Sequence, residues 1–279
     1  MREVLALVRD VGAMVVRERA AGLRVREKSP GDPVTHADEL ANEQLVTSLK
    51  SLFPSAGIVA EESANHVTDW RPEGLTLFLD PIDGTRDFVA GGDDFAVMVG
   101  AVERGVPTWG VVYEPAKNLM VFASPEGAFL ETQDGASRIE PPPHQRLEQS
   151  VLVVSRSRSG GRIGQLVDSL GAREVRRVGG MGTKLMAVAT NRAQAFVQPV
   201  GGGYAWDSAA GEAILRNLGI YITDAFGEPL SYAAAHNLRH RGVVAAAPSL
   251  HRELLARLRT SAEQMAADGY LPSWTPPRR

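Results

Sequence analysis

The 279-residue sequence contains no cysteine, which excludes disulfide bonds, thiolate zinc sites and a cysteine nucleophile. Every apolar run falls short of the length of about 18 residues that a membrane-spanning helix requires, so we expect no membrane span and no membrane partner. Segment 1–20 looks superficially like a secretion signal, but Arg9 and Asp10 interrupt its apolar stretch. Cytoplasmic residence is therefore the simplest expectation.

The sequence also has little net charge. Its 30 lysines and arginines stand against 33 aspartates and glutamates, which leaves a net charge of −3. Without a basic field or a stripe of basic and aromatic residues, we expect no nucleic-acid partner. The sequence has no Gly-x-Ser-x-Gly motif, which argues against a Ser-His-Asp hydrolase. A hydrophobic share of 44% and a charged share of 23% are ordinary for a globular enzyme.

Apolar periodicity predicts the elements of the first half. Helical spacing covers 2–20, and a second helix is expected from about Asp38 to Phe53. The intervening segment 26–38 contains breakers and is expected to be a loop. Short strands are predicted at 56–61 and 75–82, and runs at 95–105, 107–118 and 119–131 predict a β-meander.

A proline-rich polar segment, 140–150, is the best candidate boundary in the chain. We therefore expect an N-terminal α+β half with an antiparallel sheet over 1–147 and a C-terminal α/β half over 148–279. Strands and helices alternate in the second half, which is typical of α/β folds. The expected strands are 150–155, 193–198 and 242–248, and the expected helices are 164–170, 182–190, 206–219 and 249–266.

Two carboxylates follow the apolar residues of the stretch LTLFLDPIDGTRDF at 75–88. Pro81 fixes a turn after Asp80, which could aim the Ile82 carbonyl and the Asp83 carboxylate at one point. Hard cations such as Mg²⁺ bind oxygen ligands of this kind, and the N–H groups of a helix start, here at Gly84-Thr85, bind phosphate. That pairing suits metal-assisted phosphoryl transfer, although Asp-Gly is equally a common turn and an aspartate there often caps a helix.

Other acids also stand at the ends of predicted elements, where active sites collect. Glu61 and Glu62 follow a short strand, Asp38 precedes a helix, and Asp207 lies near a helix start after a glycine-rich segment. Each alone is more often a cap or a solvated charge. Spacing by itself does not bring these carboxylates together in space.

Four motifs together resemble the inositol monophosphatase superfamily of Mg²⁺-dependent, lithium-sensitive phosphomonoesterases. They are VTHAD at 34–38, AEES at 60–63, DPIDGT at 80–85 and WDSAAGEAILRNLG at 206–219, in the family's order over nearly the whole chain. The resemblance implies an α/β (α+β) fold, the layered α/β/α/β/α sandwich of the inositol monophosphatase and fructose-1,6-bisphosphatase type. Family members are monomers or homodimers, so the resemblance implies one of these two states.

The resemblance also implies roles for individual residues. Two or three Mg²⁺ ions would be held by Glu61, Asp80, the Ile82 carbonyl, Asp83 and Asp207. The catalytic set would be Asp38, Thr85 and Glu61, with Asp38 and Thr85 orienting the attacking water, and Glu62 would support the metal site from behind. The substrate, a small-molecule phosphate ester, would contact Asp83, Gly84, Thr85, Ser155, Lys184 and Asp207.

Further motifs resemble the branch of CysQ-type 3'(2'),5'-bisphosphate nucleotidases: DGTRDF at 83–88, VVSRSRS at 153–159 and GGMGTKLMAVA at 179–189. Val200 stands where inositol monophosphatases carry an inositol-binding glutamate, which argues against inositol. Arg156, Arg158, Arg162 and Lys184 are candidates to bind a second phosphate, although the arginines fit a solvated loop equally well. Tyr204 could flank an adenine or belong to the core. Arg158 and Ala205 depart from the nucleotidase pattern near the expected base or sugar pocket.

Three functional hypotheses follow. The first is a Mg²⁺-dependent phosphatase that hydrolyses 3'-phosphoadenosine 5'-phosphate by attack of a metal-activated water. The second keeps the fold but takes inositol phosphate, histidinol phosphate or another sugar phosphate. The third is a non-catalytic metal-binding module, against which the complete set of acidic residues argues.

Overall fold

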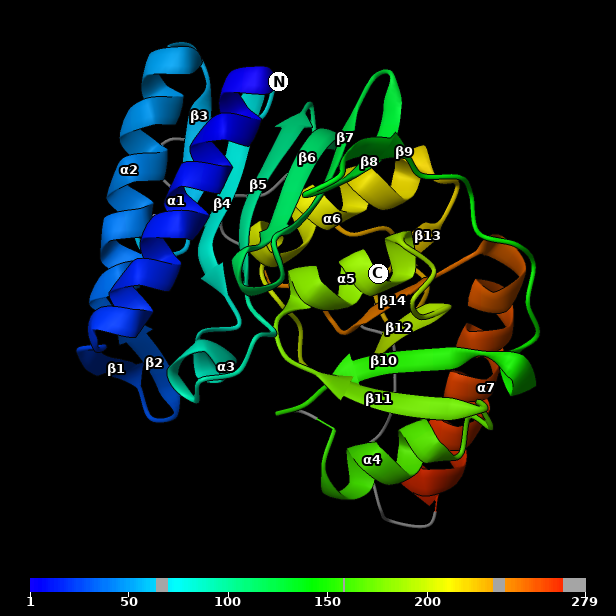
Figure 1. Ribbon diagram of the computed structural model, residues 1–279. Helices are drawn as coiled ribbons and strands as arrows, with labels where there is room; N and C mark the ends of the chain where they lie inside the picture. The colour runs from blue at the N-terminus through cyan, green and yellow to red at the C-terminus, as the bar shows by residue number, and fades with distance from the viewer. Residues whose placement is uncertain (64–69, 158, 233–238, 268–279) are drawn as a thin grey trace.

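The computed structural model describes residues 1–63, 70–157, 159–232 and 239–267. Five layers follow one another across the molecule (Figure 1): a helix pair, a seven-stranded sheet, a second helix pair, a five-stranded sheet and a final helix pair. The predicted α/β/α/β/α sandwich is therefore confirmed. No helix in the described ranges is both long and apolar enough to cross a membrane.

The first layer consists of helices α1 (Arg2–Ala21) and α2 (His36–Leu52). The apolar stripe of α1, including Val4, Val8, Val11 and Val15, is buried against the first sheet and α2. Helix α2 begins two residues before the position predicted, because the hydroxyl of Thr35 accepts a hydrogen bond from the main chain and caps the helix there.

The prediction of a loop between these two helices is wrong, because the segment contains two strands. Strands β1 (Val25–Ser29) and β2 (Asp32–Thr35) form an antiparallel ribbon joined by a tight turn at Pro30-Gly31, where Gly31 has φ 74. All of β1 is exposed, so the ribbon lacks the alternation of apolar and polar residues by which a strand is predicted.

The first sheet has the strand order β3-β4-β5-β6-β7-β8-β9. Strands β3 and β4 are parallel, and all later neighbours are antiparallel, as the meander predicted. The run at 119–131 is two strands rather than one, because Pro125 and Glu126 turn the chain between β7 and β8. The strands of the first sheet are β3 (Gly57–Ala60), β4 (Leu75–Asp83), β5 (Ala96–Glu103), β6 (Val106–Glu114), β7 (Leu119–Ser124), β8 (Gly127–Thr132) and β9 (Gly135–Arg138).

The second sheet has the order β11-β10-β12-β14-β13 and is mixed, since β10 is parallel to β11 and β12 while β14 is antiparallel to its neighbours. Strands β11 and β13 were not predicted, because each is short and partly exposed. The strands are β10 (Val151–Ser155), β11 (Glu174–Val178), β12 (Ala195–Gln198), β13 (Tyr221–Thr223) and β14 (Val243–Ala246).

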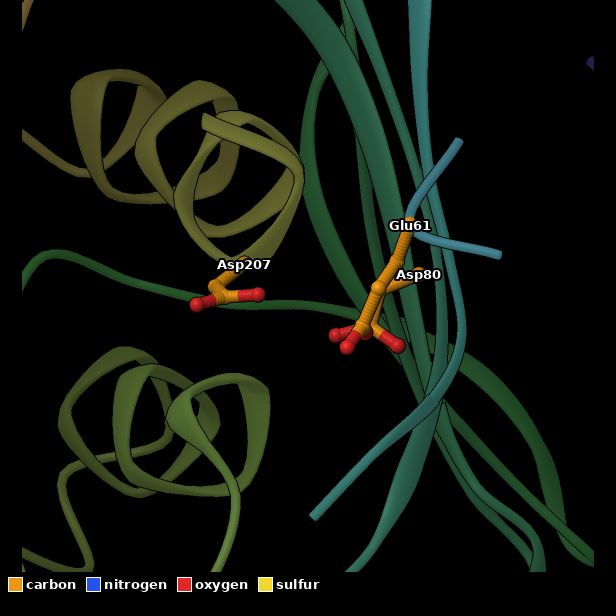
Figure 2. A group of neighbouring side chains, drawn as sticks. All are labelled: Glu61, Asp80 and Asp207. Carbon is orange, nitrogen blue, oxygen red and sulfur yellow. The ribbon is translucent and has the colours of Figure 1, made fainter. Parts of the chain in front are cut away.

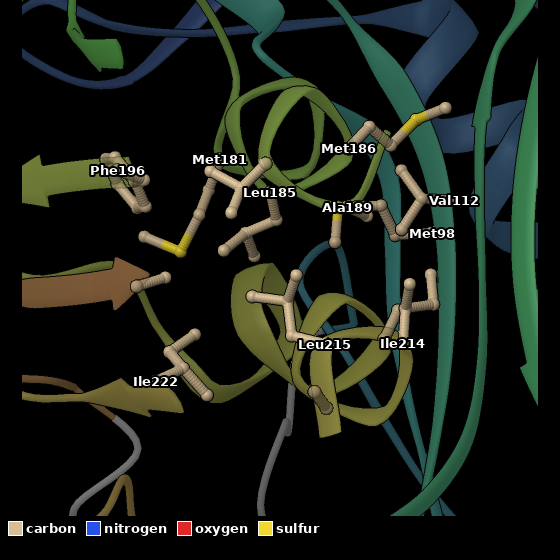
Figure 3. Close-up of a cluster of buried hydrophobic side chains, with 14 of the residues drawn as sticks. Met98, Val112, Met181, Leu185, Met186, Ala189, Phe196, Ile214, Leu215 and Ile222 are labelled. Carbon is tan, nitrogen blue, oxygen red and sulfur yellow. The ribbon is translucent and has the colours of Figure 1, made fainter. Parts of the chain in front are cut away.

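Five helices accompany these sheets. They are the short α3 (Thr85–Val89), α4 (Gly161–Asp168), α5 (Met181–Ala189), α6 (Ala205–Asn217) and α7 (Pro248–Ala267). Helices α5 and α6 lie between the two sheets, and their side chains share one apolar cluster with both (Figure 3). Met98 and Val112 of the first sheet belong to that cluster together with Leu185 of α5 and Ile214 of α6. The first sheet ends at Arg138 and the second begins at Val151, while this core spans both sheets, so the boundary near 147 stays a prediction.

Helix α6 approaches the first sheet closely. A Cβ atom at Gly100 or at Gly110 would overlap the main chain of α6 at Ala210. Glycine at both positions therefore lets the helix backbone rest directly on the sheet. This contact fixes the height of α6 above β5 and β6, and with it the position of the first turn of the helix.

Candidate active site

Three carboxylates from distant parts of the sequence converge between the first sheet and α6. One oxygen each from Glu61, Asp80 and Asp207 lie within 4.8 Å of one another. Figure 2 shows Glu61 and Asp80 coming from the sheet and Asp207 from the helix opposite. The structure thus brings together three residues that sequence spacing alone could not place side by side.

Each of these acids is held by its local backbone. The N–H of Glu61 donates to Leu79, which keeps the end of β3 beside β4. The pairing of β4 with β5 is interrupted after Asp80, and the N–H of Ile82 donates to its carboxylate at 3.1 Å. Asp207 sits in the first turn of α6 and accepts the N–H of Tyr204 at 2.8 Å.

The cluster is electrostatically unfavourable without a cation. Burial raises the pKa of Asp80 well above its ordinary value, and the negative charges of Glu61, Asp83 and Asp207 raise it further. Asp80 is only 1% exposed, so water cannot screen this repulsion. Because all the donors are oxygens, the chemistry of the set fits a hard divalent cation such as Mg²⁺.

A lysine that no sequence motif marks also faces this cluster. The ammonium group of Lys28, on β1, donates to Glu61 at 2.9 Å and also contacts the carboxylate of Glu62. Burial raises the pKa of Glu62 to about 7, while Lys28 opposes the shift. No sequence signal marked Lys28, because it lies in a polar segment that was predicted to be a loop.

Asp38 and Thr85 meet beside the cluster. The Thr85 hydroxyl lies 3.3 Å from one oxygen of Asp38 and 3.0 Å from the main-chain oxygen of Ile82. The other oxygen of Asp38 accepts two hydrogen bonds from Thr35, which orient the carboxylate. Burial raises the pKa of Asp38, and the bonds from Thr35 partly offset that effect.

Asp83 points toward the amino-terminal end of α5. Its two carboxylate oxygens accept the N–H groups of Met181 at 2.8 Å and Gly182 at 2.5 Å. Burial raises the pKa of Asp83, while the charge of Lys184 and these two N–H groups lower it. In this arrangement Asp83 joins the first sheet to α5, and its role as a metal ligand stays a prediction.

A cavity opens beside these residues. Helix α3 begins at its wall and has five residues, so the proposed phosphate contacts at Gly84 and Thr85 rest on the turn and not on a long helix. The lining residues are Asp32, Pro33, Glu61, Asp80, Ile82, Asp83, Gly84, Thr85, Arg86, Asp87, Ser155, Ser157, Gly179, Gly180, Met181, Lys184, Gln198 and Asp207. Ser155 and Lys184, predicted to contact substrate, are thus at the cavity, and Arg86 joins them.

The candidates to bind a second phosphate have different surroundings. Lys184 is buried and donates to the main-chain oxygen of Gly179 at 3.1 Å. The Nε of Arg86 donates to Gly31 at 2.8 Å. Arg162 is exposed on α4, and Arg158 lies outside the described residues.

Arg156 is engaged by acids, pairing with Asp87 and with Asp94. Tyr204, considered as a contact for adenine, is 40% exposed. Its ring stacks on Trp206 with the ring centroids 4.6 Å apart.

Known proteins resemble this chain over most of its length. The 3'(2'),5'-bisphosphate nucleotidase CysQ of Escherichia coli O157:H7 is 28% identical over 242 residues, which cover 86% of this chain and 96% of that protein. The inositol-1-monophosphatase of Bacillus subtilis is 27% identical over 88% of this chain and 91% of its own. The Nus factor SuhB of Xylella fastidiosa is 31% identical over 77% of this chain and 78% of its own.

Solved structures share the fold. An IMPase of Thermotoga maritima has a TM-score of 0.79 and 26% identity, covering 95% of this chain and all of that one. An IMPase/NADP phosphatase complexed with Mg²⁺ and phosphate has a TM-score of 0.77 and 22% identity over 92% of this chain and 93% of that one. The family model for inositol monophosphatases matches residues 1–264. The layered fold, the converging acids and this match over nearly the whole length agree, and the chain belongs to the inositol monophosphatase family of phosphatases.

Proposed function

We propose that this phosphatase is a Mg²⁺-dependent phosphomonoesterase that hydrolyses a 3'(2'),5'-bisphosphate nucleotide, with 3'-phosphoadenosine 5'-phosphate as its substrate. The observation that carries the proposal is the convergence of Glu61, Asp80 and Asp207 within 4.8 Å beside a cavity that also presents Arg86 and Lys184. Oxygen donors for a cation and basic groups for an anion thus share one site.

In this proposal Glu61, Asp80 and Asp207 would hold Mg²⁺, and the Ile82 carbonyl and Asp83 would complete the ligand set for two or three ions. When bound, Mg²⁺ would lower the pKa of the attacking water and stabilise the negative charge on the leaving oxygen. Support comes from the oxygen-only donor set and from the structural neighbour that is complexed with Mg²⁺ and phosphate.

The chain's own residues would place the attacking water. The Thr85 hydroxyl lines the cavity and lies 3.3 Å from the buried carboxylate of Asp38, so together they would bind the water and orient its lone pair. Asp38 would accept the proton, since its other oxygen is fixed by Thr35. The main-chain N–H groups of Gly84 and Thr85 would hold the substrate phosphate.

The nucleotide assignment rests on sequence similarity and on the cavity. The likeness to CysQ and the presence of Val200 in place of a glutamate favour a bisphosphate over inositol. A second candidate function, hydrolysis of inositol phosphate or another sugar phosphate, is favoured by the likeness to the Bacillus subtilis inositol-1-monophosphatase. The likeness to a Nus factor keeps a non-catalytic role as the third hypothesis.

Phosphate release from a panel of esters tests the proposal. The panel contains 3'-phosphoadenosine 5'-phosphate, inositol 1-phosphate, histidinol phosphate and fructose 1,6-bisphosphate, each with Mg²⁺, with EDTA and with Mg²⁺ plus Li⁺. We expect turnover of the nucleotide to be highest, to require Mg²⁺ and to fall with Li⁺. D207N should abolish it, while D10N, which changes an exposed aspartate on α1, should not.

The outcomes separate the three hypotheses. If kcat/KM is higher for a sugar phosphate than for the nucleotide, that sugar phosphate becomes the proposed substrate. If neither the wild type nor D207N releases phosphate from any of these esters above background, the proposed activity fails and the result favours the non-catalytic module.

A further inference from the structure

We propose that Arg156 is a positioning residue. It holds the turn at Gly84-Thr85, here called the phosphate-side turn, against Gly179-Gly180, the glycine loop that leads into α5. This role replaces the direct contact with a second substrate phosphate that its sequence position suggested. The inference rests on the proposed phosphatase function, because its effect is measured on the rate of the reaction.

The guanidinium of Arg156 is shared between two acids of the first half. One nitrogen contacts the carboxylate of Asp87, on α3, and the other lies 2.5 Å from Asp94, in the segment that follows α3. The backbone of Arg156 is also fixed, since its N–H donates to Val178 at 3.0 Å. Arg156 therefore joins the ends of β10 and β11 to the segment 85–94 across the two halves.

The carboxylates of the same two acids pack against the glycine loop before α5. The N–H of Gly179 points to the carboxylate of Asp94 at 3.4 Å. A Cβ atom at Gly179 would overlap the carboxylate of Asp87, so glycine is required for this packing. The two residues that follow Gly180 donate to Asp83. Arg156 therefore contacts Asp83 of the candidate active site indirectly, through Asp87, Asp94 and the glycine loop.

The phosphate-side turn is packed into this assembly. Gly84 has φ 91, and a Cβ atom there would lie 2.6 Å from the main-chain oxygen of Asp94 and 3.1 Å from the nitrogen of Gly180. Gly84 is therefore enclosed between the segment that Arg156 binds and the loop that Arg156 supports. A shift of either one would move the N–H groups proposed to hold the phosphate.

Charge explains why an arginine is suited to this place. Asp87 and Asp94 both face one guanidinium beside a cavity already lined by Asp80, Asp83 and other acids. Loss of Arg156 would leave two neighbouring carboxylates to repel each other, although Lys117 would still pair with Asp94 at 3.0 Å. The planar fork of arginine reaches both acids at once, which a lysine ammonium does less well.

Steady-state kinetics of R156Q and R156K distinguish positioning from direct binding. The substrates are 3'-phosphoadenosine 5'-phosphate and adenosine 2'-monophosphate, which has no second phosphate. We expect R156Q to lower kcat by the same factor, about tenfold or more, for both esters, because misplacement of a reacting group slows the chemical step whatever the substrate. R156K should recover part of the loss. A rise in KM confined to the bisphosphate, or no change with either ester, would overturn the proposal.

A double variant tests the charge argument. D94N added to R156Q removes one of the two repelling carboxylates, so part of the lost kcat should return, whereas independent effects would add. Additive losses would contradict the ion-pair mechanism. R252Q, which changes an exposed arginine on α7, is the matched control and should leave kcat unchanged.

If the wild type hydrolyses neither ester, the proposed substrate is wrong and the positioning role is decided by hydrogen–deuterium exchange. R156Q should speed exchange of the peptides that cover 84–94 and 179–182, and R252Q should not. Equal protection of these peptides in both variants would overturn the positioning role.

Discussion

The ammonium nitrogen of Lys28 lies 2.9 Å from a carboxylate oxygen of Glu61, one of the three acids that converge in the candidate metal site. Burial lowers the pKa of Lys28, but the charges of Glu61 and Glu62 outweigh burial and raise the pKa above its ordinary value. The lysine therefore stays charged at every physiological pH. A cation at Glu61 would therefore share this carboxylate with Lys28.

Replacement of Lys28 by glutamine should tighten Mg²⁺ binding. Removing a positive charge beside Glu61 makes the site more attractive to a divalent cation, by roughly threefold or more in the dissociation constant. Isothermal titration of Mg²⁺ into K28Q and the wild type measures the change. K50Q, on the exposed side of α2, is the control and should bind like the wild type. Weaker binding by K28Q would show that Lys28 supports the cation instead of competing with it.

Replacement of Thr85 by valine should lower kcat while the fold is retained. The hydroxyl bonds to Ile82 and faces Asp38, and valine has nearly the same shape without either interaction. A positioned proton-transfer group contributes about a hundredfold or more, so we expect a loss of that order. T85S keeps the hydroxyl and should retain most of the rate. Equal losses in T85S and T85V would assign the effect to packing.

A buried network that includes Ser208 and Glu212 of α6 should make the stability of the protein depend on pH. Tyr232 donates to Glu212 at 2.8 Å, and Ser208 lies 3.0 Å from Tyr232 and 2.6 Å from a ring nitrogen of His240. Burial raises the pKa of Glu212 to about 7 and lowers the pKa of His240 to about 4. Glu212 thus favours folding in its protonated form, and His240 in its neutral form.

The sign for Glu212 follows from proton uptake. Between the ordinary glutamate pKa of 4.5 and about 7 the folded state holds the proton and the unfolded state has lost it, so stability falls as pH rises through this range. E212Q removes that slope. The free energy of unfolding of E212Q relative to the wild type should therefore increase up to about pH 7 and then level off, at a gain of at most on the order of 3 kcal/mol.

Urea denaturation across this pH range measures the difference. E43Q, at an exposed position on α2, is the matched control and should show no such slope. His240 acts in the opposite direction, because the unfolded state takes up a proton that the buried ring does not, so the wild type loses stability as pH falls from the ordinary histidine pKa of 6.5 toward about 4. A flat difference between E212Q and the wild type would show that Glu212 is ionised in the folded state.

Alanine at Gly110 should destabilise the protein. The added Cβ atom would overlap the main chain at Ala210, so α6 has to move off the sheet, at a cost of about 1–3 kcal/mol or more. G74A is the control, because its Cβ would meet only Arg71 at an ordinary 3.6 Å. Thermal unfolding compares the two variants. G110A should also weaken Mg²⁺ binding, since α6 carries Asp207.

The sequence by itself determined the class of elements and the family. Apolar periodicity predicts α1, α2 and the meander because each buries one continuous face, and the motifs around Asp80 and Asp207 identify the superfamily. The β1–β2 ribbon, β9, β11 and β13 were missed, because exposed or very short strands carry no such pattern. The sequence named Glu61, Asp80 and Asp207 as candidate site residues, but it gave no distance between them.

Tertiary structure decided which charges meet. Glu61, Asp80 and Asp207 converge because β3 lies parallel to β4 and glycines let α6 rest on β5 and β6. The ion pairs of Lys28 with Glu61 and of Arg156 with Asp94 could not be predicted from the sequence, because a contact between residues more than thirty positions apart depends on how separate elements pack. Local sequence fixes where a side chain sits on its own element, whereas contacts between elements decide which group it faces.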